Sequence, residues 1–159
     1  KSLDDYPTNE WKKTIDVNLN AMFYITKHFL KLMLKSKNPV ILNTSSTYGK
    51  VSPNKSIYGN SGINAPVGYT ATKAGIIGFT KYVATHYGDR GLRANVLIPG
   101  GVENKNQSKS FKKNYSNLTP LKRMAKQNEY KRAVLFLVSD ESSYMTGSEF
   151  IIDGGWTAW

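Results

Sequence analysis

The hydrophobic positions at the start of the chain follow a helical spacing. Large apolar side chains recur every three or four residues, at Trp11, Ile15, Leu19, Met22, Phe29 and Met33. Thr8 has the side-chain chemistry of an N-cap, and the stripe fades at about Lys35, shortly before Asn38-Pro39, which cannot continue a helix. The pattern therefore predicts a long amphipathic helix between Thr8 and about Lys35.

Three short apolar runs predict buried strands, at residues 40–44, 94–98 and 149–152. Helical spacing of apolar residues returns at 69–89 and 128–138, whereas the segments rich in Gly, Asn, Ser or Lys predict loops at 45–68 and from 99 to about 127. Strands that alternate with helices are typical of a parallel sheet with helices on its faces. Since such sheets usually have about five to six strands, we predict the α/β class and, over residues 1–159, the C-terminal half of a doubly wound Rossmann-type sheet with three strands and three main helices.

Composition excludes several classes of site. The chain has no cysteine, which rules out disulfides, zinc-thiolate centres and a cysteine nucleophile, and we find no cluster of metal ligands. The same absence fits a reducing compartment, so we expect a cytoplasmic protein. The longest purely apolar run, Ala133–Val138, is far shorter than the ~20 residues that cross a bilayer.

The net charge of +11 is concentrated in one segment. Residues 105–132 hold nine Lys or Arg and one acid, Glu129. Such a segment could steer an anionic or nucleotide-linked substrate to a nearby site, or it could simply be a solvated loop. Nucleic-acid binding is the rival from another class, but no known binding motif is present and the aromatic residues fall on helix faces; we expect no nucleic-acid partner.

Tyr69-Thr70-Ala71-Thr72-Lys73 places a phenol and an ammonium one helical turn apart on one face. A nearby cation favours the phenolate, which would make Tyr69 an acid and base usable near neutral pH. By itself the pair could be a chance occurrence, since the chain has 10 Tyr and many Lys.

Two of the predicted strands are followed by residues suited to binding a ligand at the edge of the sheet. Residues 40–44 run into Ser45-Ser46, and residues 94–98 into Pro99-Gly100-Gly101. Ligands of parallel sheets bind at the carboxyl edge, where a hydroxyl can donate to a substrate oxygen and a glycine backbone can approach a flat ligand. Either end could instead be an ordinary turn.

Taken together and in order, these motifs resemble the short-chain dehydrogenase/reductase family from Trp11 to Trp156. The matching stretches are 16–19 (Asp-Val-Asn-Leu), 41–46 with Gly49, 69–75 (Tyr-Thr-Ala-Thr-Lys-Ala-Gly), 95–102 (Asn-Val-Leu-Ile-Pro-Gly-Gly-Val), and 145–147 leading to 152–155.

The resemblance implies an NAD- or NADP-dependent oxidoreductase that interconverts a carbonyl and an alcohol. It assigns carbonyl polarisation to Ser46 and acid and base catalysis to Tyr69, which is also expected to be among the cofactor-binding residues. Lys73 would lower the pKa of the tyrosine and bind the nicotinamide ribose. Asn18 would break the long helix locally and hold the water of a proton relay. The nicotinamide would also lie along the backbone of Pro99, Gly100 and Val102.

The chain departs from the family pattern in three ways. No glycine-rich phosphate-binding turn follows a strand, so we expect residues 1–159 alone neither to hold the cofactor tightly nor to turn over, and the choice between NAD and NADP stays open. The interval from Ser46 to Tyr69 is long, which predicts a flap over 51–66 beside the substrate; Ser61, within it, lies outside the strand-end pattern. Asn104 stands where many members carry a threonine.

Finer features resemble bacterial members linked to flagellin modification and surface-sugar biosynthesis. They are the loop around 56–60, the run 119–124 and the tail 153–159. This suggests a sugar or nucleotide-sugar substrate. The resemblance also implies a homodimer or homotetramer formed through helices 9–36 and 69–89 and the last strand. A non-catalytic remnant of the family that only oligomerises is the alternative.

Overall fold

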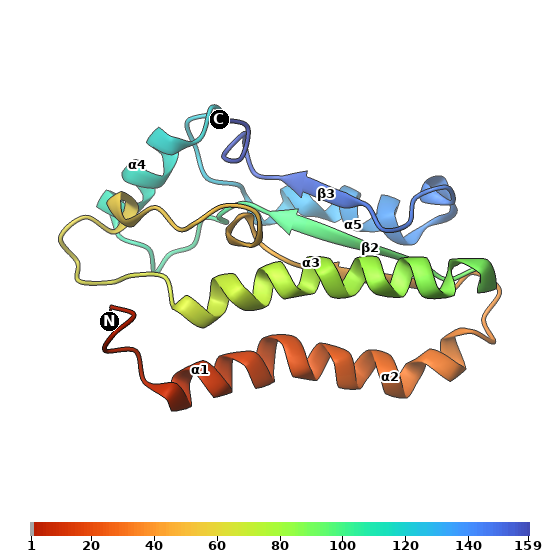
Figure 1. Cartoon of the computed structure of the whole chain (residues 1–159). Coiled ribbons are helices and arrows are strands. Elements are labelled where there is room, and N and C mark those ends of the chain that lie inside the picture. Colours follow the sequence, from red (N-terminus) through yellow and green to blue (C-terminus); the bar gives the residue numbers. More distant parts are fainter. Residues whose placement is uncertain (1) are drawn as a thin grey trace.

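The computed structural model describes residues 2–159; Lys1 lies outside the described part. The predicted long helix is present as α1 (Thr8–Ile15), a π-helical turn (Asp16–Asn20) and α2 (Ala21–Met33), which form one rod (Figure 1). Pro7, not Thr8, occupies the N-cap position, and no side chain caps this end. The predicted local break at Asn18 is confirmed, because Asn18 lies in the middle of the π turn.

The described residues form a three-stranded parallel sheet, as predicted. Its strands are β1 (Val40–Thr44), β2 (Arg93–Pro99) and β3 (Glu149–Ile152), in the order β1-β2-β3. Thr44 pairs with Leu97, so the carboxyl ends of β1 and β2 reach the same edge. Residues Ala94 to Ile98 of β2 are buried, which explains the near-continuous apolar run at the centre of the sheet.

Helix α3 (Val67–Tyr87) begins two residues before the predicted start at Tyr69, because Pro66 occupies the N-cap position. A short 3₁₀ turn (Gly88–Arg90) follows, and Gly91 ends the segment with a left-handed φ of +79°, a conformation that favours glycine. The buried side chains of α3 pack against β2; Ile76, Ile77, Val96 and Ile98 form one core cluster.

The prediction of a loop from 99 to about 127 was wrong in part, since it contains helix α4 (Lys109–Leu118). The Ser108 hydroxyl caps it by accepting from the Phe111 N–H at 3.1 Å. Tyr115 on this helix is buried. The predicted helix over 128–138 is present as a 3₁₀ turn (Gln127–Tyr130) followed by α5 (Lys131–Val138).

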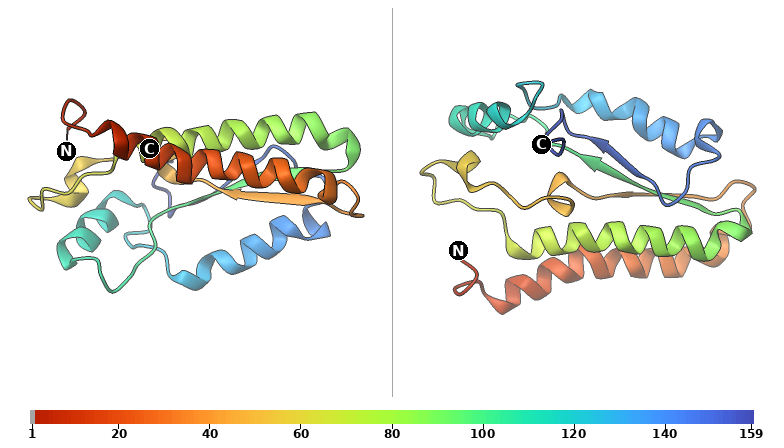
Figure 2. Two further views of the ribbon diagram at one scale, coloured as in Figure 1. Left: turned by 90° about the horizontal axis from the view of Figure 1, so that it is seen from below. Right: turned by 45° about the horizontal axis from the view of Figure 1, so that its top comes forward.

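The elements form layers. Helices α1, α2 and α3 lie side by side against one face of the sheet, and α5 covers the other face (Figures 1 and 2). Helix α4 lies beyond the carboxyl ends of β1 and β2, close to the C-terminal turn. This arrangement leaves the strand ends between α3 and α4, where the candidate site is found. None of the helices in residues 2–159 has the length and apolar character needed to span a bilayer.

Candidate active site

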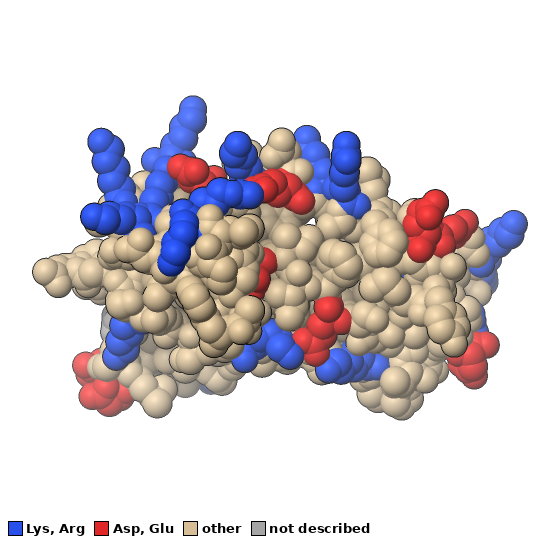
Figure 3. Space-filling model, turned by 90° about the horizontal axis from the view of Figure 1, so that it is seen from above, with Lys and Arg blue, Asp and Glu red and all other residues tan. Residues whose placement is uncertain are grey.

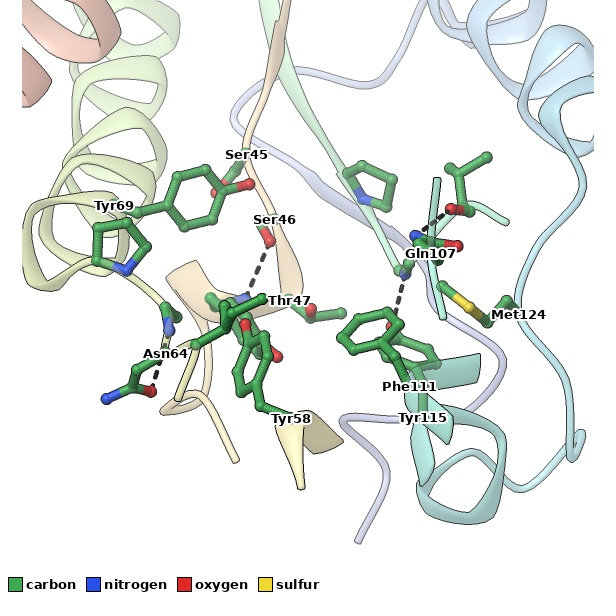
Figure 4. Close-up of a pocket in the computed structure, with 18 residues that line it drawn as sticks. Ser45, Ser46, Thr47, Tyr58, Asn64, Tyr69, Gln107, Phe111, Tyr115 and Met124 are labelled. Carbon is green, nitrogen blue, oxygen red and sulfur yellow. Dashed lines mark hydrogen bonds between the residues drawn. The ribbon is translucent and has the colours of Figure 1, made fainter. Parts of the chain in front are cut away.

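A cavity of about 630 Å³ lies at the carboxyl edge of β1 and β2. It is lined by five of the seven residues to which the resemblance assigns a role, namely Ser46, Tyr69, Pro99, Gly100 and Val102, whereas Asn18 and Lys73 do not line it. Figure 4 shows Tyr69 and Ser46 on one side of the space and Phe111, Tyr115 and Met124 on the other. Ser46 and Pro99 lie close together because β1 and β2 are parallel and in register: Ser46 follows the end of β1, and Pro99 is the last residue of β2.

Lys73 lies one turn after Tyr69 on α3. Its Nζ is 5.5 Å from the centroid of the Tyr69 ring and donates a hydrogen bond to the Thr44 carbonyl at 3.0 Å. Burial lowers the pKa of the Lys73 ammonium, because the charged form loses part of its hydration. The strand end thus fixes the ammonium beside the phenol ring, as the Tyr-x-x-x-Lys spacing predicts.

The two serines after β1 have different environments. The buried Ser45 hydroxyl donates to the Lys73 carbonyl at 2.7 Å and joins the strand end to α3. The Ser46 hydroxyl faces the cavity and accepts from the Tyr48 N–H at 3.2 Å, which leaves its proton for donation. This geometry is consistent with Ser46, not Ser45, as the serine that would polarise a substrate carbonyl.

Asn18 is placed outside this cavity. Its Nδ2 donates to the Thr72 hydroxyl at 3.3 Å, and Thr72 donates to the Tyr69 carbonyl at 2.8 Å. Asn18 borders another hollow, between α2 and β1. Its contact with the helix that carries Tyr69 therefore runs through Thr72, a fully buried residue to which sequence reasoning assigned no role.

The far wall of the cavity was not found from the sequence. It consists of Phe111 and Tyr115 on α4 with Met124 from the following segment. The Tyr115 hydroxyl accepts from the Gly101 N–H at 2.5 Å, and its ring stacks on Trp156 with centroids 4.4 Å apart. Burial raises the pKa of Tyr115 to about 12. The i, i+4 spacing of Phe111 and Tyr115 could have indicated a helix with one apolar face, but the lysines and asparagines around them favoured the prediction of a loop.

The predicted flap over 51–66 lies beside the cavity and contributes five of its lining residues, Tyr58, Ile63, Asn64, Ala65 and Pro66. Ser61 does not line the cavity; its hydroxyl accepts from the Ile63 N–H at 3.3 Å. Asn104 lies outside it as well, in a turn where its side chain accepts from the Asn106 N–H.

The basic segment does not supply charge to the cavity. Among residues 2–159, none of the side chains that line it is charged. Lys112 is paired with Glu103 at 2.8 Å, and Arg123 with Glu129 at 2.7 Å. Figure 3 shows basic side chains gathered on the outer face at the end of the molecule where α4 lies. The described residues also contain no group of three or more His, Asp or Glu that could hold a metal ion.

Comparison with known proteins identifies the family to which the chain belongs. A family model described as enoyl-(acyl carrier protein) reductase matches residues 1–157. Cyclohexanol dehydrogenase of Acinetobacter sp. (strain SE19) is 32% identical over 157 residues, which cover 99% of this chain and 59% of that protein. The 3-oxoacyl-(acyl-carrier-protein) reductase of Thermotoga maritima is 38% identical over 149 residues, covering 92% of this chain and 56% of that protein.

A solved structure gives the same result. The short-chain dehydrogenase from Leptospira borgpetersenii, crystallised with bound NAD+, matches with a TM-score of 0.91 and 39% identity, over 99% of this chain and 60% of that one. The chain thus spans less than two thirds of the length of these relatives. The family match over residues 1–157 and the close structural likeness show that the chain belongs to the short-chain dehydrogenase/reductase family.

Proposed function

We propose that the chain is the catalytic part of an NAD(P)-dependent oxidoreductase that interconverts a small-molecule carbonyl and an alcohol. One observation carries the proposal. The hydroxyls of Ser46 and Tyr69 face one cavity with the backbone of Pro99 to Val102, and the Lys73 ammonium lies over the Tyr69 ring. The oxidoreductases among its relatives support the same chemistry.

In the reducing direction, the Ser46 hydroxyl donates a hydrogen bond to the substrate carbonyl oxygen and stabilises the negative charge that develops there. Tyr69 gives its proton to the same oxygen, and the Lys73 ammonium compensates the charge left on the phenol. The bound cofactor supplies the hydride that reaches the carbonyl carbon. In the oxidising direction, Tyr69 accepts the proton.

The nicotinamide end of the cofactor would be held along Pro99, Gly100 and Val102, which line the same cavity as Tyr69. The two glycines of this stretch serve close packing, since a Cβ on Gly100 would lie 2.7 Å from the Cα of Asp153 and one on Gly101 would lie 2.6 Å from the ring of Tyr115. The sequence has no glycine-rich turn for the pyrophosphate. We therefore expect residues 1–159 alone to bind NADH more weakly than micromolar in a calorimetric titration.

Replacement of Tyr69 by Phe in the complete gene product tests the proposal. Turnover should fall by about 100-fold or more, since a positioned acid or base contributes that much. Tyr82→Phe is the matched control, because Tyr82 lies on the same helix, is 54% exposed and is outside the cavity. A complete gene product that assembles by size-exclusion chromatography but shows no turnover would instead support the non-catalytic, oligomerising remnant, and turnover that is unchanged in Tyr69→Phe would contradict the role proposed for Tyr69.

Several finer predictions remain untested. These are a sugar or nucleotide-sugar substrate, a place in flagellin modification or surface-sugar biosynthesis, a homodimer or homotetramer, and a cytoplasmic location. A charged sugar derivative would meet the lysines only outside the cavity, since the residues described as lining it carry no charge. Salt-dependent binding to random DNA would argue for the rival nucleic-acid role.

A further inference from the structure

One carboxylate joins three elements beside the candidate active site. Glu149, the first residue of β3, forms ion pairs with the Lys50 ammonium at 2.8 Å and the Lys81 ammonium at 2.7 Å. Its side chain is 17% exposed, whereas those of Lys50 and Lys81 are 38% and 52% exposed. Lys50 ends the 3₁₀ turn Thr47–Gly49, and Lys81 lies on α3. The carboxylate therefore connects β3 both to α3 and to the turn that follows β1.

That turn is one hydrogen-bonded unit, and it determines where the Ser46 hydroxyl lies. The hydroxyl accepts from the Tyr48 N–H at 3.2 Å (Figure 4), and the Ser46 carbonyl accepts from the Gly49 N–H at 2.8 Å. The Thr47 carbonyl accepts from the Lys50 N–H at 2.9 Å. A displacement of Lys50 is therefore transmitted through the backbone of the turn to Ser46.

The two lysines differ in what else holds their segments. Helix α3 packs against β2 through a core cluster that includes the buried Ile76 and Ile77, so its position does not depend on Lys81. Of the three residues in the 3₁₀ turn, Thr47 alone is buried, and the ion pair of Lys50 is the link of the turn to β3. Loss of the two ion pairs should therefore have different consequences, a displaced serine in one case and an undisturbed helix in the other.

We infer that Glu149, acting through Lys50, is a positioning residue for the Ser46 hydroxyl. The inference rests on the proposed function, in which this hydroxyl donates to the substrate carbonyl oxygen. Such a hydrogen bond strengthens as negative charge develops on the oxygen, so a misplaced hydroxyl lowers kcat and leaves KM nearly unchanged. A carboxylate that only stabilised the fold would leave kcat unchanged whichever of its two ion pairs was removed.

Two lysine variants of the complete gene product test the inference, with cyclohexanol and NAD+ or NADP+ as the probe reaction. In Lys50→Ala, kcat should fall about fivefold at unchanged KM, which is the factor that one ion pair of this kind contributes at most. Lys81→Ala is the matched control, because it removes the other ion pair of the same carboxylate; its kcat should stay within about twofold of the native value. Lys50→Arg keeps the cation and should restore kcat to within about twofold.

A double-mutant cycle separates the contact from unrelated effects. Glu149→Gln should lower kcat as much as Lys50→Ala does, and the two changes together should cause no further loss, since both remove the same contact. Unchanged kcat in Lys50→Ala, or equal losses of kcat in Lys50→Ala and Lys81→Ala, would overturn the inference and leave the proposed function standing. If Ser46→Ala leaves turnover unchanged, the role proposed for Ser46 is itself wrong.

A second measurement needs no substrate and decides if cyclohexanol does not turn over. Amide hydrogen exchange over residues 48–51, followed by mass spectrometry, reports opening of the turn directly. Exchange should be about fivefold faster in Lys50→Ala than in the native protein and unchanged in Lys81→Ala. Equal exchange rates in all three proteins would refute the inference.

Discussion

Replacement of Gly49 by Ala tests the contact on which the site depends most. A Cβ at this position would lie 2.6 Å from the Ser45 hydroxyl oxygen and 2.8 Å from both the carbonyl carbon and oxygen of Lys73. In the native protein the Ser45 hydroxyl bonds to that same carbonyl at 2.7 Å, and the Lys73 ammonium bonds back to Thr44 at 3.0 Å. The glycine therefore allows the first turns of α3 to touch the end of β1.

The expected cost can be worked from these contacts. Two of the obstructing atoms belong to backbone, which cannot rotate away, so overpacking should destabilise the fold by about 1–3 kcal/mol. Loss of the Ser45 hydrogen bond adds about 1 kcal/mol, for a total of about 2–4 kcal/mol. Because Tyr69 lies one turn before Lys73, a shift of α3 near 1 Å would also lower kcat by about 100-fold.

Urea denaturation of the complete gene product measures the first effect, and steady-state kinetics the second. Gly78→Ala is the matched control, since Gly78 lies on α3 and its added Cβ would have no described atom within 4 Å apart from its chain neighbours and the adjacent backbone of its own helix. Alanine there should leave stability unchanged or raise it by up to about 1 kcal/mol. If Gly49→Ala behaves like Gly78→Ala, the close approach of β1 and α3 does not exist as described.

Two other residues give independent predictions. Tyr115→Phe leaves the Gly101 N–H without its partner and should cost about 1–3 kcal/mol at pH 7 in urea denaturation. Burial raises the pKa of Tyr115 from its ordinary 10.0 to about 12, so the stability of the native protein falls as the pH rises from 10 to about 12. The difference in unfolding free energy between the native protein and Tyr115→Phe should therefore decrease over this pH range. A difference that stays constant would contradict the prediction. Glu149 bonds Lys50 at 2.8 Å and Lys81 at 2.7 Å, which lowers its pKa below 4.5. The two ion pairs contribute at most about 1 kcal/mol each to the stability of the fold. This contribution is present above pH 4.5 and is lost as the pH falls, because the lowered pKa belongs to the folded state. In thermal melts, the Tm of Glu149→Gln should therefore fall less on acidification than the Tm of the native protein.

The sheet was predictable because its strands are short apolar runs; the central strand β2 is buried, and β1 and β3 on either side of it are partly buried. A continuous apolar run is a local signal that can be read without knowledge of distant residues. The runs at 40–44 and 149–152 match β1 and β3, and the run at 94–98 differs from β2 by one residue at each end. From the parallel order of the strands, Ser46 and Pro99 are then expected at one edge of the sheet.

Helix α4 was missed because its stability comes from distant contacts. Its ten residues are mostly Lys, Asn and Ser, a composition that also suits a loop. Tyr115 is held by the Gly101 N–H and by the Trp156 ring, which lies 41 positions further along the chain. A local pattern cannot show such partners. The far wall of the cavity therefore emerged only from the fold.

Asn18 shows how a correct local prediction can leave the spatial partner undetermined. A local break of the helix at Asn18 was expected, but the surface that this turn meets, which consists of small residues on α3, was not. A Cβ on Gly75 would lie 3.1 Å from the Leu19 side chain, and one on Gly68 would lie 3.0 Å from Thr14. Since these glycines bring the two helices so close, Asn18 reaches Thr72 and through it the Tyr69 carbonyl. Its role in a proton relay stays a prediction, whereas its observed contacts join it through Thr72 to the turn of α3 that carries the phenol.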